Sequence, residues 1–155
     1  VDYGCAKGFL VHALRIIGCN AFGEDISEYA ISHCHPRVKE YVSLPNDNKY
    51  DLLICKDVLE HVQATDIPSV LQSFKRKSSQ FFFAVPLGDN DRFRIREYEV
   101  DITHVTKKDE EWWIDMFQSQ GLKLIDFSYS FGSVKDKWMK VNPYGNGFFV
   151  METNG

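Results

Sequence analysis

Short apolar runs alternate with helical patterns along the chain, and the first example is the opening stretch VDYGCAKGFL. Its first three residues are typical of a strand end, and a glycine follows at once. Apolar residues then recur at helical spacing until Gly18, which can supply the left-handed end of a helix. The stretch therefore predicts a strand, a glycine-rich turn and a helix over residues 9–17.

The rest of the chain repeats this alternation. Further strands are predicted by the runs NAFGED, VKEYV, YDLLICKDV, QFFFAVP, LKLIDFSYSF and NGFFVMET. Helices are predicted by ISEYAISHCH, with Ser27 as its N-cap and Pro36 at its end, and by IPSVLQSFKRK and DEEWWIDMFQSQG. A polar, irregular stretch over residues 88–108 interrupts the pattern, and a connection of this length is typical of a lid or a binding loop.

Strands that alternate with helices indicate a largely parallel sheet with right-handed crossovers and helices on both faces. We therefore predict one α/β domain over residues 1–155, in which three layers surround a mostly parallel seven-stranded sheet with an antiparallel C-terminal strand. Because Val1 rather than Met stands first, inside a predicted strand, we expect that residues upstream of this strand are missing.

Composition narrows the class of protein. With 44% hydrophobic and 14% aromatic residues, the chain holds enough apolar material for one core. The formal net charge of −4 gives no basic field for nucleic acid or an anionic membrane, and no apolar run reaches the ~20 residues of a membrane span. The four cysteines lack CxxC spacing, which indicates reduced thiols and no metal site. We expect a cytoplasmic monomer or homodimer without nucleic-acid or membrane partners.

The glycine-rich turn has the pattern Asp2-x-Gly4-x-Ala6-x-Gly8. In a sheet of this kind, a ligand crosses the carboxyl ends of the strands, and side chains at the first turn would block its approach. Asp25, which lies 17 residues after Gly8, follows the second predicted strand at the separation expected for a carboxylate that binds a ribose diol. These residues predict a site for an adenosine-containing ligand.

The chemistry of the turn distinguishes two such ligands. A dinucleotide-binding turn has the form GxGxxG and presents a helix N-terminus to a pyrophosphate. Here the spacing is GxAxG, and Asp2 stands two residues before the first glycine. A carboxylate at that position repels a pyrophosphate but attracts the ammonium group of an amino acid. S-adenosylmethionine carries this ammonium and no phosphate, so the turn favours it over a nicotinamide dinucleotide.

The ordered segments VDYGCAKGFL, GEDISEYAI, LP and YDLLICKDVLEHV resemble the small-molecule branch of the class I S-adenosylmethionine-dependent methyltransferases. The similarity covers about the first 62 residues and continues more weakly through DITHVTKKDEEWW and GLKLI. It implies a Rossmann-like sandwich and S-adenosyl-L-methionine as the cofactor.

The resemblance also implies which residues bind the cofactor. The methionine portion would lie against Asp2, Gly4, Cys5, Ala6 and Gly8. Ribose and adenine would lie against Asp25, the backbone of Ile26, and the end of the third strand around Glu40 to Ser43, which includes Tyr41 and Val42. Lys56 and Asp57 would lie beside the sulfonium.

Two departures from the family pattern matter for these assignments. Ala6 stands where the family often has glycine, and its methyl group is tolerated if its φ is negative. Glu24 adjoins Asp25, but alternation along a strand places the two on opposite faces, and the spacing favours Asp25 as the ribose ligand.

The acceptor site is predicted in the loop over residues 88–108. His104 is the only histidine of this loop, and we predict that it acts as the general base for an acceptor hydroxyl. The alternative is that Asp101, Thr103 and His104 form a hydrogen-bonded turn that anchors the loop. We interpret the pair Glu60 and His61, in LEHV, as structural rather than catalytic.

Three arginines of the same loop alternate with other residues, so an extended backbone would place Arg92, Arg94 and Arg96 on one face. Arg92 and Arg94 are predicted to bind an anionic acceptor, with a solvated face balanced by neighbouring acids as the alternative. Trp112 and Trp113 point about 100° apart in a helix, so one of them, Trp112, is predicted to line the substrate pocket while the other packs.

Taken together, the residues and the resemblance predict an S-adenosylmethionine-dependent methyltransferase that acts on a small-molecule acceptor, a hydroxyl of a sugar-like or secondary metabolite. Three alternatives stay open. One is an N-methyltransferase on a small amine, for which His104 would be dispensable. The others are a non-catalytic module that binds the cofactor or a partner, and a nicotinamide-dependent oxidoreductase, which the GxAxG spacing opposes.

Overall fold

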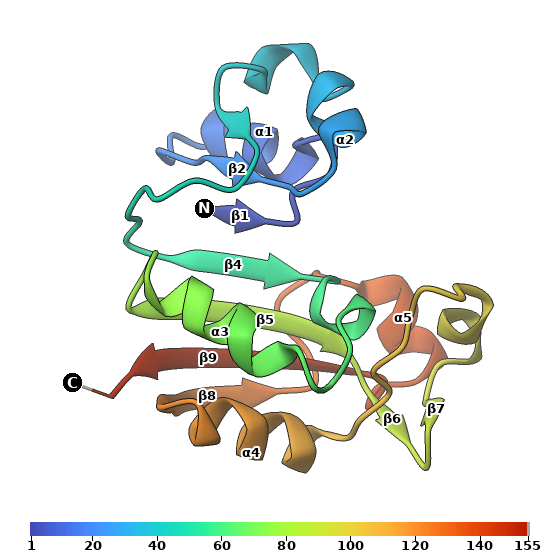
Figure 1. Ribbon diagram of the computed structural model, residues 1–155. Helices are drawn as coiled ribbons and strands as arrows, with labels where there is room; N and C mark the ends of the chain where they lie inside the picture. Colours follow the sequence, from blue (N-terminus) through green and yellow to red (C-terminus); the bar gives the residue numbers. More distant parts are fainter. Residues whose placement is uncertain (155) are drawn as a thin grey trace.

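The computed structural model, which describes residues 1–154, contains one seven-stranded sheet with the strand order β3-β2-β1-β4-β5-β9-β8 (Figure 1). Its strands are β1 (Asp2–Tyr3), β2 (Gly23–Glu24), β3 (Val42–Ser43), β4 (Leu53–Lys56), β5 (Gln80–Pro86), β8 (Leu122–Ser128) and β9 (Asn146–Thr153). Neighbours among β1 to β5 are parallel, whereas β9 runs antiparallel to both β5 and β8. The predicted mostly parallel sheet with an antiparallel C-terminal strand is confirmed.

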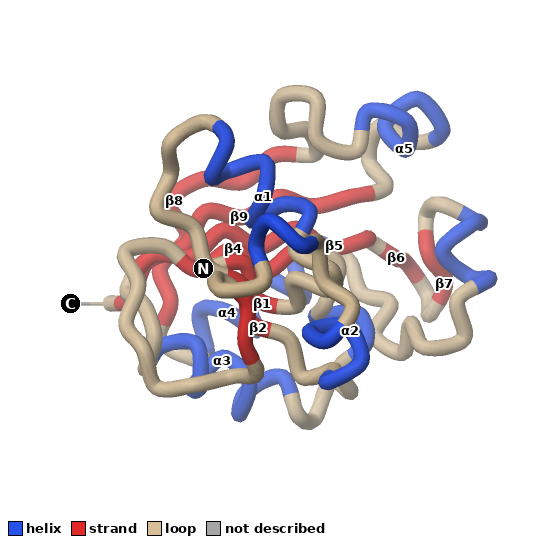
Figure 2. The backbone as a smooth tube through the Cα atoms, turned by 90° about the horizontal axis from the view of Figure 1, so that it is seen from above, coloured by secondary structure: helices blue, strands red, loops and turns tan. Residues whose placement is uncertain are grey.

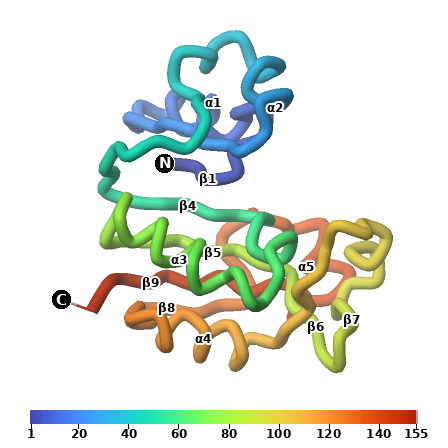
Figure 3. Tube along the Cα trace, viewed as in Figure 1, coloured from blue at the N-terminus to red at the C-terminus, as the bar shows by residue number. Residues whose placement is uncertain are grey.

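Helices cover both faces of the sheet. They are α1 (Phe9–Ile16), α2 (Glu28–Ser32), α3 (Ile67–Lys75), α4 (Glu110–Ser119) and α5 (Asp136–Val141). Figure 2 shows α3 and α4 on one side of the strands and α1 and α5 on the other. Figure 3 follows the chain from the edge formed by β1 to β3, back to β4 in the middle of the sheet, and on to β8 and β9.

Local signals explain where the helices begin and end. The hydroxyl of Ser27 accepts a hydrogen bond from the backbone N–H of Ala30, as predicted for an N-cap. The carboxylate of Asp109 accepts one from the N–H of Trp112 at 2.8 Å and caps α4 in the same way. Gly18 has a φ of 89° and ends the turn that follows α1.

The larger core lies beneath α3 and α4. Alternate residues of β5, Phe81 and Phe83, point into it and are fully buried with Phe74 of α3 and with Trp113 and Phe117 of α4. Burial of each such ring contributes roughly 2 to 3 kcal/mol. The other face of β5 presents Phe82, Ala84 and Pro86 toward the opposite side. This second face borders the candidate site.

A smaller core lies beneath α1 and supports the other end of the sheet. It consists of Cys5, Val11, Ala21, Cys34, Val38 and Val42. Burial raises the pKa of the Cys5 thiol to about 12, and all four cysteines are unpaired. The Cys5 thiol is therefore a protonated packing group at neutral pH.

Three elements differ from the sequence predictions. The strand expected at residues 38–42 is a 3₁₀ turn, Pro36–Val38, followed by β3 at Val42–Ser43. Pro36 favours the first position of that turn, and Val38 is buried in the smaller core. The helix α5 lies in a segment expected to be a turn. Residues 88–108 contain a short hairpin, β6 (Gly88–Asp89) and β7 (Arg92–Phe93), and a 3₁₀ helix, Arg96–Val100. None of the helices in residues 1–154 has the length and apolar content that crossing a membrane requires.

Candidate active site

A cleft of about 800 Å³ lies against the α1 face of the sheet. This volume is within the range of small-molecule binding sites. Its walls come from the first turn and α1, from β4 and β5, and from the segment between β8 and α5. The lining residues are Asp2, Gly4, Cys5, Ala6, Phe9, Leu10, Leu14, Leu52, Ile54, Lys56, Asp57, Phe82, Phe131 and Val134. The cleft therefore reaches the carboxyl ends of the central strands β1 and β4, where the sequence predicts a ligand.

Asp2 is the buried acid of this cleft. Only 6% of the residue is exposed, and burial raises the pKa of its carboxyl to about 6, although the charge of Lys56 opposes the shift. None of residues 1–154 contributes a hydrogen bond that stabilises the charged form of the Asp2 carboxyl. A buried carboxylate without a donor is unfavourable unless a cation or a donor reaches it. Asp2 is thus suited to an ammonium group of a ligand.

The first turn holds three left-handed residues, with φ values of 78° at Gly4, 47° at Ala6 and 75° at Gly8. The condition of a negative φ at Ala6 is therefore not met, and this alanine adopts a backbone conformation that favours glycine. A Cβ at Gly4 would clash with the side chain of Val58, and one at Gly8 would lie 2.8 Å from Val38. Backbone conformation and internal packing thus account for both glycines, in addition to any approach by a ligand.

Asp25 ties the second strand to the first turn. Its carboxylate accepts hydrogen bonds of 2.8 Å from the backbone N–H groups of Ala6 and Ser27. Two of its four lone-pair sites are used in this way, and the others are open to a ribose diol. Glu24 points to the opposite face, where it is fully buried with Lys77 at 2.9 Å and Tyr50 at 2.9 Å. The structure thus leaves Asp25 as the acid beside the cleft.

Lys56 and Asp57 line the cleft at the end of β4 and form an ion pair. A second ion pair joins Asp57 to Lys135, which precedes α5 and has a side chain only 6% exposed. Burial alone would raise the pKa of Asp57, but Lys135 and Lys56 hold it below its usual value. Burial lowers the pKa of Lys135, and Asp57 opposes this. Asp57 and Lys135 both have positive φ values, so the pair is held in sparsely populated backbone conformations.

The sequence did not reveal Lys135 as a member of the site. Its Nζ also donates to Asn146 Oδ1 at 2.8 Å and lies 3.3 Å from the hydroxyl of Tyr98. Tyr98, Lys135 and Asn146 come from three segments that the fold brings together behind Asp57. An apolar residue directly before the lysine, Val134, contributes to the cleft wall, but no local pattern marks this segment.

Three predicted adenine contacts are not brought to the cleft. Glu40 and Tyr41 precede β3 and lie at its amino end, because the strand begins later than predicted. The Tyr41 ring stacks on the guanidinium of Arg15 at 3.2 Å, and Val42 is buried in the smaller core. The carboxyl end of β3 is formed by Ser43, the last residue of the predicted strand end. Ile26, which follows Asp25, is largely exposed.

His104 lies in a hydrogen-bonded turn of the kind considered as its alternative role. Asp101 accepts hydrogen bonds from the N–H and the hydroxyl of Thr103, and its carbonyl accepts one from the N–H of His104. The His104 ring contacts the ring of His61, with centroids 4.6 Å apart. Glu60 is buried beside them, and burial, together with the charge of Asp57, raises its pKa to about 8. His104 is not among the residues that line the cleft.

The arginines and Trp112 do not form one substrate-binding face. Arg96 begins a 3₁₀ helix, so the predicted extended stretch ends before it. Arg94 donates to Asp89 at 2.7 and 2.8 Å and to Glu110 at 2.7 Å, which braces the loop against α4. Arg92 is exposed. Trp112 is half-buried and packs against the larger core, on the side of the sheet opposite α1.

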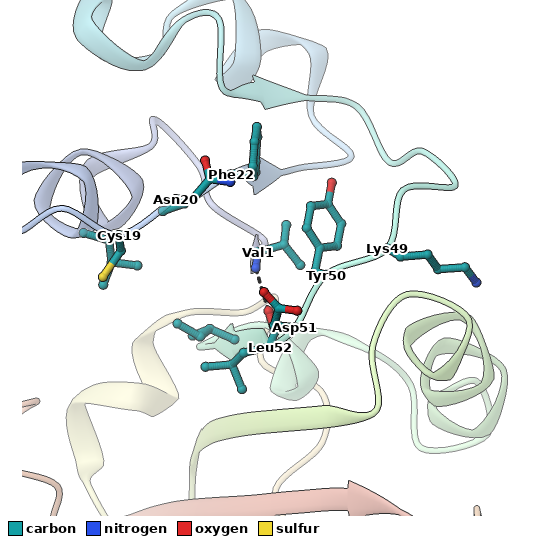
Figure 4. Close-up of a pocket in the computed structure, with 11 residues that line it drawn as sticks. Val1, Cys19, Asn20, Phe22, Lys49, Tyr50, Asp51 and Leu52 are labelled. Carbon is teal, nitrogen blue, oxygen red and sulfur yellow. Dashed lines mark hydrogen bonds between the residues drawn. The ribbon is translucent and has the colours of Figure 1, made fainter.

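A second cavity of about 280 Å³ adjoins the cleft at Leu14, Leu52 and Ile54. Figure 4 shows Val1, Phe22, Tyr50 and Asp51 around it. The amino group of Val1 donates to the carbonyl of Leu52 at 2.6 Å in this region. None of the predicted site residues lines this cavity, so the larger cleft is the candidate active site.

Solved structures with a similar fold include three methyltransferases. A SAM-dependent methyltransferase from Archaeoglobus fulgidus has a TM-score of 0.70 and 14% identity, covering 98% of this chain and 84% of that one. Magnesium protoporphyrin IX methyltransferase from Synechocystis PCC 6803, with bound SAH, has a TM-score of 0.72 and 15% identity, covering 99% and 73%. Mitomycin 7-O-methyltransferase has a TM-score of 0.72 and 15% identity, covering 99% and 48%.

Sequence comparison assigns the family independently of these structures. A search of curated proteins found no match. The sequence model of a family described as a methyltransferase domain matches residues 1–126, which include the first turn, β2, β4 and the loop with His104. The chain therefore belongs to the methyltransferase domain family.

Proposed function

We propose that this chain binds S-adenosylmethionine in the cleft and transfers its methyl group to a hydroxyl of a small, sugar-like or secondary metabolite. The observation that carries the proposal is Asp2, a 6%-exposed carboxylate in the cleft whose charge no hydrogen bond from residues 1–154 stabilises. An amino acid ammonium supplies the missing partner. Membership of the methyltransferase domain family supports methyl transfer as the reaction.

The residues of the cleft divide between the parts of this ligand. Asp2 holds the ammonium, and the first turn, whose residues Gly4, Cys5 and Ala6 line the cleft, lies against the methionine portion. Asp25 receives the ribose diol with its free lone pairs, as its bonds to Ala6 and Ser27 fix its orientation. The apolar side chains of Phe9, Leu10 and Phe82 exclude water from the remaining wall.

The bound cofactor supplies a methyl group on a sulfonium, which is already activated for displacement. The protein therefore contributes mainly alignment, and a base where the acceptor is a hydroxyl. The Lys56, Asp57 and Lys135 cluster positions the end of β4 next to the reacting groups. The general-base role of His104 stays a prediction. A hydroxyl acceptor is supported by one similar structure, a protein described as a 7-O-methyltransferase.

Calorimetric titration with S-adenosylmethionine, S-adenosylhomocysteine and NAD tests the ligand. We expect binding of the first two and none of NAD, whereas binding of NAD alone would overturn the proposal. A panel of radiolabelled methyl-transfer assays then tests the acceptor class. Transfer to hydroxyl compounds is expected, transfer only to amines would identify an N-methyltransferase, and binding without transfer to any acceptor would identify a non-catalytic module.

His104→Ala separates the two roles of that residue. A general base is expected to lose turnover by roughly 100-fold or more while the affinity for S-adenosylmethionine is kept. Full turnover with intact cofactor affinity would leave His104 with the anchoring role alone. His33→Ala is the matched control, because His33 is an exposed histidine at the end of α2.

A further inference from the structure

Glu60, His61 and His104 converge beside the end of β4. One carboxylate oxygen and one ring nitrogen from each histidine lie within 4.8 Å of one another. Glu60 and His61 belong to a 3₁₀ helix, Leu59–His61, and His104 comes from the loop before α4. Two imidazoles and one carboxylate form a common ligand set for divalent first-row transition cations.

The hydrogen bonds of both histidines leave one ring nitrogen free. His104 Nδ1 lies 2.9 Å from the carbonyl oxygen of Tyr98, which only accepts, so Nδ1 carries the proton in the neutral ring. His61 Nδ1 lies 2.8 Å from Thr103 Oγ1. The Thr103 hydroxyl donates to Asp101 Oδ1 at 2.5 Å, so Oγ1 accepts from His61. In both neutral rings the Nε2 lone pair is therefore available to a cation.

Such outer hydrogen bonds are typical of metal-binding histidines, because they fix the tautomer and the orientation of the ring. Here they come from Tyr98 and from the pair Thr103 and Asp101. Asp101 Oδ2 also lies 3.6 Å from His104 Nε2, a distance beyond a hydrogen bond.

Glu60 provides a separate observation that indicates a ligand. The residue is 1% exposed, and its Oε2 has no hydrogen-bond partner among the described residues. Buried polar atoms are almost always paired, and an orphaned carboxylate oxygen needs an explanation. A cation in the cluster would supply the missing partner.

The backbone holds the three groups in place before any cation binds. The carbonyl of Glu60 accepts hydrogen bonds from the N–H groups of Val105 and Thr106, at 2.8 and 3.0 Å. The hydroxyl of Thr106 donates to the carbonyl of Val62 at 2.6 Å. The segment that follows His104 is therefore tied to the segment that carries Glu60 and His61. Tetrahedral ligands of zinc lie about 3.4 Å apart, so small side-chain rotations would close the site.

We propose that Glu60, His61 and His104 form a binding site for one divalent first-row transition cation, with Zn²⁺ as the probe. Three protein ligands leave at least one coordination position open, as in catalytic rather than structural sites. The proposal goes beyond methyl transfer and is measured without S-adenosylmethionine. It uses the Nε2 atom of His104 as a ligand, whereas a general base would use the same atom to take up a proton.

Titration of the chelator-treated full chain with Zn²⁺ tests the proposal. Calorimetry should give one equivalent with a dissociation constant in the micromolar range or tighter, and Co²⁺ should give the visible absorption of a site with nitrogen and oxygen ligands. Glu60→Gln, His61→Ala and His104→Ala should each weaken binding by more than 10-fold. Thr103→Val leaves all three ligands in place but removes the outer hydrogen bond to His61, together with the bond from the Thr103 hydroxyl to Asp101, and should weaken Zn²⁺ binding by about 10-fold.

His12→Ala is the matched control. The rings of His12 and His35 stack with centroids 4.1 Å apart. This second pair of neighbouring histidines lies outside the cluster and therefore serves as the control. Binding should be unchanged in this variant. The absence of stoichiometric binding in the wild type, binding that survives both His61→Ala and His104→Ala, or equal loss in His12→Ala would overturn the proposal. Because His61 is exposed, His61→Ala is expected to fold, and a thermal melt checks this.

Failure of the cation site and failure of the proposed function give different results. Binding of S-adenosylmethionine in the presence of a chelator, without any uptake of Zn²⁺, would reject the site and leave the cofactor cleft intact. Uptake of Zn²⁺ without binding of S-adenosylmethionine would support the cation site and reject the proposed cofactor cleft.

Discussion

The cofactor cleft and the polar region that follows the end of β4 are built in different ways. The cofactor cleft takes most of its walls from two continuous stretches, residues 2–14 and 52–57. A second, polar region shares only Asp57 with the lining of the cleft; it joins Glu60 and His61 to His104, and Asp57 to Lys135, from segments far apart in the chain. The first is a largely apolar cleft with one unpaired acid, and the second is a network of opposite charges and histidines. The first region is assembled by the pairing of β1 with β4, whereas the second depends on contacts between loop segments that no strand pairing joins.

The largest expected effect concerns the charge of Asp2. Its pKa rises from 3.8 to about 6 in the folded chain, so the native state binds the proton more tightly than the unfolded state. The protonated Asp2 carboxyl therefore adds to the free energy of unfolding below about pH 4. This contribution of at most about 3 kcal/mol is lost as the pH rises through about 6. Urea unfolding at pH 4.5 and pH 7 measures it.

Asp2→Asn is the comparison for this effect, because other groups also titrate in the same window. The difference in unfolding free energy between wild type and variant should change with pH in the stated direction. A difference that is constant from pH 4.5 to pH 7 would show that Asp2 is not desolvated.

A smaller effect is expected where the second region is broken. Lys135→Met leaves Asp57 with Lys56 alone and removes a charge that is 6% exposed. We expect a loss of about 2 kcal/mol, less than for a fully buried pair because the Asp57 side chain is 35% exposed. Lys140→Met, at an exposed position of α5, should stay within about 0.5 kcal/mol of the wild type. Equal losses in the two variants would contradict a structural role for the ion pair.

The smallest effect lies in the first turn. Ala6→Gly should stabilise the chain by about 0.5 kcal/mol, since relief of the left-handed alanine outweighs the greater freedom of glycine in the unfolded state. Ala13→Gly, in the middle of α1, should destabilise it by about 1 kcal/mol. Thermal melts of both variants measure the difference, and a loss of stability in Ala6→Gly would argue against the positive φ.

The same contrast explains what the sequence could predict. The first turn and Asp25 follow from local spacing, and Lys56 and Asp57 at the end of β4 follow from the family resemblance; the structure brings these residues together at the cleft or beside it. Spacing does not show the positive φ of Ala6, nor the late start of β3, which follows a turn that buries Val38 in the smaller core. Lys135 is missed because its partner, Asp57, lies 78 residues earlier in the chain. The sequence singled out His104 as the only histidine of its loop, but only the structure shows that it lies beside Glu60 and His61.

The affinity of the Asp2→Asn variant for S-adenosylmethionine tests the central claim most directly. Calorimetry at pH 7.5 should show affinity at least 10-fold weaker than wild type, because a charged hydrogen bond contributes about 1.5 to 3 kcal/mol. Asp47→Asn, which changes an exposed acid outside the cleft, should bind as the wild type does. Unchanged affinity in Asp2→Asn would contradict the assignment of this carboxylate to the ammonium of the ligand.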